Sequence, residues 1–147
     1  MSLTSLNTAV AANEGRAMAV KHPVERTPLK TADGTPVTIT LLGQDSEVYT
    51  KADLDIQRAT FERLSTGAPF SPAESAEQKT LGLAACTVAW SGIPQGWIDG
   101  TEDETPAPFS KANAAKLYSN LGVKWVRGQV EKFIEERAHF LRPAGDS

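Results

Sequence analysis

Residues 37–46 read Val37-Thr38-Ile39-Thr40-Leu41-Leu42-Gly43-Gln44-Asp45-Ser46, and within this stretch the chain changes from one kind of secondary structure to another. Every second residue from Val37 to Leu41 is aliphatic, which is the period-2 pattern of a half-buried β-strand. Asp45 or Ser46 then offers a side-chain oxygen that can cap the first amides of a helix. The stretch therefore predicts a strand that ends at Gly43 and a helical chain beyond it.

The segment before this stretch carries further strand and turn signals. Met18 and Val20 alternate with small or polar residues. Asp33-Gly34 is a strong turn signal, because both residues tolerate the backbone of a tight turn. We therefore expect a small antiparallel β element over residues 15–43. Residues 1–14 are rich in Ser, Thr, Ala and Asn and are expected to be a flexible N-terminal segment, either frayed or a weak helix held by partners.

The residues after Gly43 have the spacing of helices. A first helix is expected over about 47–64, with Leu54, Phe61 and Leu64 on one face. Other expected segments are a helix from Ser71 to about Trp90, a loop over 91–108, helices over 111–119 and about 123–141, and a loose tail over 143–147. The prediction is a mainly α fold with a small N-terminal antiparallel β element (α+β). A compact helical body of about four helices, residues 44–142, completes a single domain of residues 15–142.

The helix that begins after Ser71 has the clearest start in the chain. Ser71-Pro72-Ala73-Glu74 combines a capping serine, a proline at the first helical position and a capping-box glutamate. The second half of the helix, Leu81 to Trp90, is apolar nearly all round, so this helix is expected to be the most buried one. Replacing Leu83 or Val88 with aspartate is then expected to abolish soluble folding, since an unpaired buried carboxylate is very unfavourable.

Charge and composition limit the class of protein. The chain has 147 residues, of which 40% are hydrophobic and 22% charged, and its net charge is −3. These values are ordinary for a soluble globular domain, whereas nucleic-acid binders usually show a basic excess. The longest nearly apolar run, Leu83 to Trp90, is far shorter than the roughly 20 residues that span a bilayer. We therefore expect a cytoplasmic protein that binds neither nucleic acid nor membrane.

Residues that carry chemistry are few and scattered. Cys86 is the one cysteine, and its apolar neighbours disfavour a thiolate. His22 and His139 show no ligand spacing with other metal-binding residue types. The sequence therefore predicts no catalytic, cofactor-binding or metal-binding residues, and the chain is not expected to be an enzyme. Were it one, Asp99 and Glu102 would be the best candidates.

An acidic stretch, Asp99-Gly100-Thr101-Glu102-Asp103-Glu104, places four carboxylates in six residues. Its order does not match the alternating acids and glycine of a calcium-binding loop. Two interpretations stay open: a solvated loop, or a docking patch for a basic partner.

Aromatic and aliphatic residues supply the candidates for binding a partner. Trp97 lies in the predicted loop and is expected to be exposed or docked, whereas Trp90 and Trp125 are expected to be core. The last predicted helix carries an apolar stripe, which is our main candidate for the contact. The candidate partner-binding residues are Trp97, Val126, Val130, Phe133 and Ile134. The alternative is that the stripe only closes the protein's own core.

Several segments, in their order along the chain, resemble one protein family. They are Val37 to Ser46 followed by a helix, Val88-Ala89-Trp90-Ser91-Gly92-Ile93, Pro108-Phe109-Ser110-Lys111 through Tyr118, Trp125 to Val130, and Phe133 to Leu141. This order is similar to that of the tail assembly chaperones of long-tailed bacteriophages. The resemblance covers roughly residues 18–141.

The resemblance implies a function in virion morphogenesis. Such a chaperone binds the tape-measure protein, keeps its apolar helical segments soluble and brings it together with the tail-tube protein. It acts in the host cell cytoplasm during assembly and is not expected in the mature virion. No cofactor is implied, and the chain could also form a homo-oligomer.

Other classes of protein fit the same composition. A structural virion component, such as a head–tail connector or tail-completion protein, has a similar size and also lacks catalytic residues. A bacterial regulator or antitoxin is disfavoured, because no predicted helix has the basic character of a DNA-recognition helix.

Overall fold

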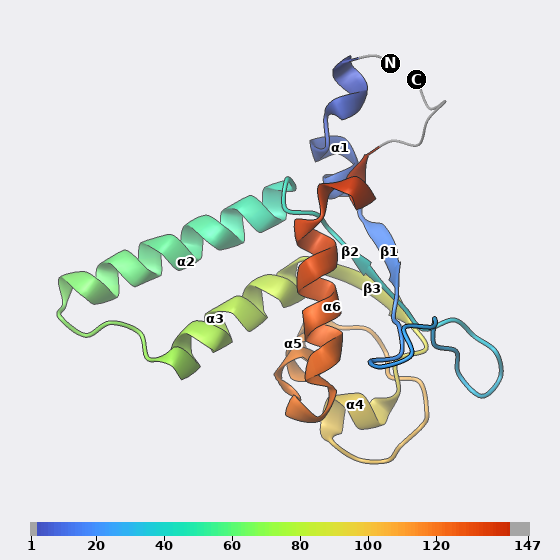
Figure 1. Ribbon diagram of the computed structural model, residues 1–147. Helices are drawn as coiled ribbons and strands as arrows, with labels where there is room; N and C mark the ends of the chain where they lie inside the picture. Colours follow the sequence, from blue (N-terminus) through green and yellow to red (C-terminus); the bar gives the residue numbers. More distant parts are fainter. Residues whose placement is uncertain (1–2, 142–147) are drawn as a thin grey trace.

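The computed structural model describes residues 3–141, over which the chain forms helices and one small sheet (Figure 1). The predicted mainly α, α+β fold is confirmed, since the structure is 54% helical and has a small three-stranded antiparallel sheet. The α-helices are α1 (Ala9–Glu14), α2 (Glu47–Ser65), α3 (Pro72–Ala85), α4 (Gln95–Asp99), α5 (Lys111–Ser119) and α6 (Lys124–Glu135). The strands are β1 (Arg16–Ala19), β2 (Thr38–Leu41) and β3 (Thr87–Ser91), and the 3-10 helices are η1 (Leu3–Leu6), η2 (Leu121–Val123) and η3 (Arg137–Phe140).

The sheet is antiparallel and has the order β1-β2-β3. In the central strand, Ile39 lies opposite Met18 of β1 and Trp90 of β3. The prediction of a helix that continues to Trp90 is therefore wrong from Cys86 onward. Cys86 is the C-cap of α3, and the next residue begins a strand that is rich in β-branched and aromatic side chains, which favour a pleated surface.

Residues 9–14 were expected to be flexible, but they form α1 and pack on η3. Ala11 and Ala12 are buried together with Phe140 of η3. The Gly43 amide donates to the Ala12 carbonyl over 3.1 Å. A short alanine-rich segment has little tendency to form a stable helix alone, so these contacts account for the difference. The expected loose tail, 143–147, lies outside the described residues.

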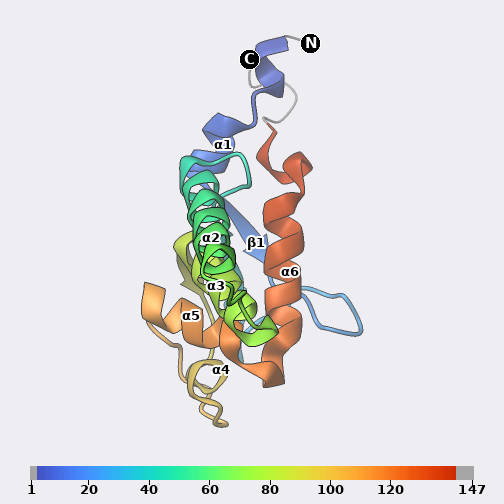
Figure 2. The same ribbon diagram turned by 90° about the vertical axis from the view of Figure 1, so that its left-hand side faces the viewer.

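The helices α2 and α3 form a hairpin that projects from the rest of the molecule (Figures 1 and 2). The Ser46 hydroxyl caps α2, and Ser71 with Glu74 forms the predicted capping box at the start of α3. No residue of α2 is buried. The expectation that the Ser71 helix is the most buried one is also wrong, because three of the 14 residues of α3 are buried (Thr80, Leu83 and Ala84), against three of the nine residues of α5.

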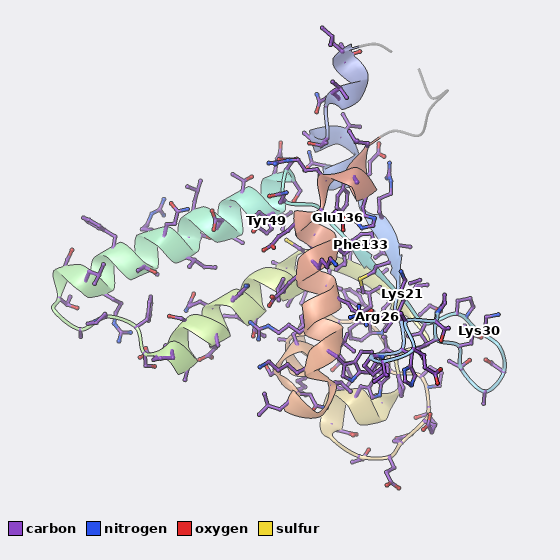
Figure 3. The ribbon with its side chains drawn as sticks, in the orientation of Figure 1. Lys21, Arg26, Lys30, Tyr49, Phe133 and Glu136 are labelled. Carbon is purple, nitrogen blue, oxygen red and sulfur yellow. The ribbon has the colours of Figure 1, made fainter. Side chains whose placement is uncertain are left out.

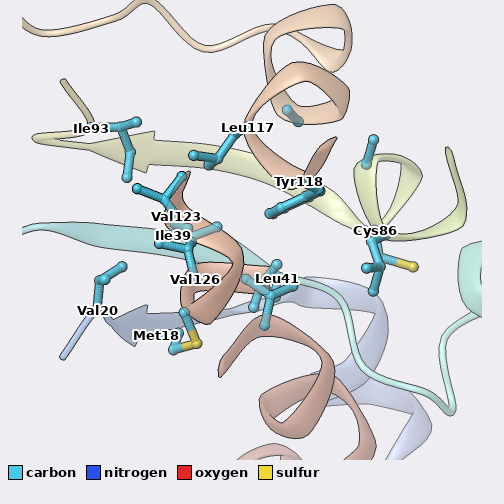
Figure 4. Packing of buried hydrophobic residues seen from close by; sticks show 14 of the residues in the cluster. Met18, Val20, Ile39, Leu41, Cys86, Ile93, Leu117, Tyr118, Val123 and Val126 are labelled. Atoms are coloured by element: carbon cyan, nitrogen blue, oxygen red, sulfur yellow. The ribbon is translucent and has the colours of Figure 1, made fainter. Parts of the chain in front are cut away.

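The core lies between the sheet and the C-terminal helices (Figure 4). Its members are buried apolar side chains of β1, β2, α3, α4, α5, α6 and the segments next to them. They include Met18, Val20, Ile39 and Leu41 from the sheet region, Leu117 and Tyr118 from α5, and Val126, Val130 and Ile134 from α6. The C-terminal helix ends at Glu135, earlier than predicted, and η3 follows it.

Candidate partner-binding site

A small groove lies where the base of the hairpin meets α6. Its apolar lining consists of Tyr49, Ala52 and Ile56 from α2, Gly82 and Leu83 from α3, and Ile134 from α6. The groove encloses about 60 Å³. On this measure about 10–15 Å³ already holds one water, so the groove has room for a small apolar side chain.

The groove has an acidic rim. Four charged side chains border it: Asp53, Lys79, Glu131 and Glu135. The Lys79 Nζ lies 3.4 Å from a carboxylate oxygen of Glu131. The rim carries three acids and one lysine, so its net charge is negative. It therefore favours a partner with basic residues beside its apolar anchor.

Tyr49 points from α2 toward α6 (Figure 3). The pKa of its hydroxyl depends on the burial and the charges around it. Partial burial raises the pKa of its hydroxyl, and the carboxylates of Glu135 and Asp53 raise it further. Both effects disfavour a phenolate. Tyr49 is thus a neutral donor at the edge of an apolar floor and a negative rim.

The Arg127 side chain links α6 to the hairpin. The Arg127 guanidinium donates to the Thr80 hydroxyl (2.7 Å) and to the Ala76 carbonyl (3.2 Å) of α3. The same group donates to a Glu131 carboxylate oxygen over 2.9 Å. Arg127 therefore ties α6 to α3, two of the three helices that line the groove.

Three of the predicted partner-binding residues belong to the core. Val126, Val130 and Ile134 each have no exposed surface. Val126 and Val130 pack with the sheet residues and are not available to a partner, which corrects their assignment. Ile134 differs, because it lies under the groove and forms part of its floor. Val126 and Val130 of the stripe thus close the protein's own core, whereas Ile134 also lines the groove.

Phe133 and Trp97 are partly buried and do not line the groove. Phe133 packs its ring on His139 with centroids 4.1 Å apart, and it meets Phe140 edge to face. Trp97 belongs to α4, within the segment predicted to be a loop, and meets Trp125 edge to face at 5.4 Å. These contacts are internal. The structure therefore does not gather the five predicted residues into one surface.

The residues with possible chemistry stay apart in the structure. Burial raises the pKa of the Cys86 thiol to about 11, which leaves it a neutral thiol at physiological pH. Asp99 and Asp103 accept hydrogen bonds from Thr101 and Thr105 respectively, and these bonds lower the pKa of each carboxyl. Over residues 3–141, no three His, Cys, Asp or Glu side chains lie close enough to hold a metal ion.

The groove residues of α2 were missed by the sequence interpretation. Tyr49, Ala52 and Ile56 recur at helical spacing, which is the signal that could have identified them. The sequence interpretation instead chose the face of Leu54, Phe61 and Leu64, because that face is more strongly apolar. That second face is exposed in the structure, with 53%, 71% and 58% of the respective residue surfaces accessible.

Two further observations bear on the class of protein. None of the helices that the structure describes is both long and apolar enough to cross a bilayer. No family model, no curated protein and no solved structure matches the chain. The resemblance to the tail assembly chaperones of long-tailed bacteriophages therefore stays a prediction.

Proposed function

We propose that this chain is a non-enzymatic assembly chaperone, of the kind that long-tailed bacteriophages use for the tape-measure protein. The observation that carries the proposal is the groove between α2, α3 and α6, with its apolar floor and acidic rim. Such a surface suits an amphipathic helix whose apolar side chain enters the groove. A basic residue beside that anchor would meet Asp53 or Glu135.

The position of the groove supports transient binding. One wall, α2, has no buried residue, and segments with few buried contacts are the ones that open locally at low free energy. The other wall, α6, is anchored by core residues such as Val130. One movable wall against one fixed wall allows the groove to adapt to successive apolar segments of a long partner.

Co-expression with the tape-measure protein of the same phage tests the proposal. That partner is expected to aggregate alone, and to stay soluble and co-purify with this chain. If its solubility does not change and no complex survives size exclusion at physiological salt, the proposed function is wrong.

Rim variants connect this result to the groove. Asp53→Lys with Glu135→Lys reverses two exposed acids of the rim and is expected to weaken the complex by at least about tenfold, since each like-charge contact is unfavourable. Glu77→Lys with Glu104→Lys changes the net charge equally at exposed positions outside the groove. This control is expected to bind like wild type.

Mass spectrometry of purified particles separates this function from a structural one. A chaperone is expected to be absent from the particle. A head–tail connector or tail-completion protein would be present in a fixed small copy number, and that result would favour the structural alternative.

A further inference from the structure

The outer face of α2, which points away from α3, carries an exposed apolar ridge. We define the outer ridge as Leu54, Phe61 and Leu64, which are 53%, 71% and 58% exposed. With about 3.6 residues per turn, Leu54 and Phe61 lie on one line along the helix. The ridge is separate from the groove, whose α2 residues lie on the opposite, inner face.

A row of charged residues runs beside this ridge with alternating sign. Lys51, Asp55, Arg58 and Glu62 follow one another at spacings of four, three and four residues, so they form one stripe of the helix. All four are exposed, and none of them forms an ion pair with another residue within 3–141. Their charges are therefore available to a partner.

The order of these charges is self-complementary. From Lys51 to Glu62 the four charges are positive, negative, positive and negative. In the reverse direction, from Glu62 to Lys51, each place in the row therefore has the opposite charge. When two antiparallel helices are related by a twofold axis perpendicular to them, the same flank of each helix faces its copy. An axis between residues 56 and 57 then places Lys51 opposite Glu62 of the second copy, and Asp55 opposite Arg58 of the second copy. The symmetry makes four opposite-charge pairs.

The same axis also brings the apolar side chains together. It sets Leu54 within about one helical turn of Phe61 of the second copy, and the reverse contact follows by symmetry. A parallel pair of helices lacks these opposite-charge pairs. It would place the charged row of one helix against the side of the second helix that lies across the ridge from its own charged row, and that side carries Thr50, Asp53 and Gln57. We propose that this chain forms an antiparallel homodimer in which the outer ridges of two α2 helices pack together.

The dimer is expected to be weak and reversible. One helix of 19 residues offers less contact area than the roughly 1,600 Å² of a standard stable interface. Self-association should therefore rise with protein concentration and fall with salt, because the charge pairs lie at the solvent-exposed edge of the contact.

Sedimentation velocity over a concentration series, on the full chain, tests the proposal with a charge swap. Lys51→Glu alone and Glu62→Lys alone each set like charges together twice in the dimer, so each is expected to raise the dissociation constant about tenfold. The double variant restores opposite charges only in the antiparallel pairing and is expected to recover wild-type association. Phe61→Ala should abolish the dimer, whereas Leu81→Ala, at an exposed position of α3, should not.

Circular dichroism confirms that each variant is folded. A chain that stays monomeric at all concentrations would overturn the proposal, as would a dimer unaffected by Phe61→Ala. A double variant that associates no better than the single ones would overturn the antiparallel arrangement. These outcomes do not depend on the tape-measure protein, so they are distinct from failure of the proposed function.

Discussion

At the scale of single residues, Gly96 shows how closely the acidic loop packs on α4. Its amide donates to the Asp103 carbonyl over 2.8 Å. A β-carbon at this position would lie 2.3 Å from the Thr101 carbonyl oxygen. Because that oxygen belongs to the backbone, a larger residue fits only if the loop moves.

We therefore expect Gly96→Ala to lower the free energy of unfolding by about 1–3 kcal/mol, the usual effect of overpacking. Urea unfolding at neutral pH measures this. Gly128→Ala is the matched control, since no atom lies within 4 Å of its added methyl group, and alanine inside α6 should raise stability by about 0.5–1 kcal/mol. Wild-type stability of Gly96→Ala would mean that the loop does not pack as described.

Asp45 makes the folded state sensitive to acid. The Arg137 guanidinium donates two hydrogen bonds to its carboxylate, over 2.8 and 3.0 Å, and the Thr8 hydroxyl donates another. These bonds hold the pKa of Asp45 below its ordinary value. A lowered folded pKa contributes stability above the unfolded pKa of about 3.9, and this contribution is lost as the pH falls through the folded pKa.

Asp45→Asn is thus expected to be less stable than wild type at neutral pH, by about 1 kcal/mol or less because Arg137 is largely exposed. The difference should shrink below about pH 4. Urea unfolding at a series of pH values measures it, with the exposed Glu104→Gln as the control. A difference that stays constant down to about pH 3 would contradict the role of this carboxylate.

At the scale of elements, local signals identified some segments and misassigned others. The start of α2 at Glu47, the capping box of α3 and the bounds of α5 follow from caps and breakers, which act within a few residues. The strand β3 could not be separated from a buried helix, because a short apolar run has no distinguishing period. It becomes a strand by pairing with β2, which lies about 50 residues earlier in the chain.

The candidate site was less predictable than the fold, and the reason lies on α2. The faces of Tyr49, Ala52 and Ile56 and of Leu54, Phe61 and Leu64 both have helical spacing. Spacing shows that a face exists, but only tertiary packing decides which face meets α3 and α6. The stronger apolar face is the exposed one, so hydrophobicity alone selects the wrong side.

The sequence predicts the same outcome for aspartate at Leu83 and at Val88, but the two side chains differ in burial. Leu83 is 6% exposed and belongs to the core, whereas Val88 of β3 is 38% exposed. We expect Leu83→Asp to abolish soluble folding, because a buried unpaired carboxylate is very unfavourable, and Val88→Asp to fold. Soluble yield and thermal unfolding measure both. Equal behaviour of the two variants would contradict the described end of α3 and start of β3.

At the scale of the whole molecule, the two ends of the chain build the body and the middle projects from it. The Lys21 backbone exchanges two hydrogen bonds with the Gln129 side chain, over 2.9 and 2.8 Å. Ala12 of α1 packs with Phe140 of η3. Between these regions the chain leaves the body along α2 and returns along α3 (Figure 1). The core therefore depends on residues far apart in sequence, while the hairpin depends on its neighbours.

This division predicts that the outer half of the hairpin can be removed. None of residues 60–75 is buried. They include the ion pair between Arg63 and Glu74, 2.8 Å apart and partly exposed, and ion pairs open to solvent contribute little to stability. A chain in which a short glycine–serine loop replaces residues 60–75 is expected to keep its secondary structure and unfold cooperatively in urea.

Extending the replacement to residues 57–80 removes Thr80, which is buried and accepts the Arg127 hydrogen bond of 2.7 Å. That longer replacement should be strongly destabilised, since Arg127 loses its partners on α3. If the shorter replacement also fails to fold, the hairpin is part of the core, and the separation of body and projection is wrong.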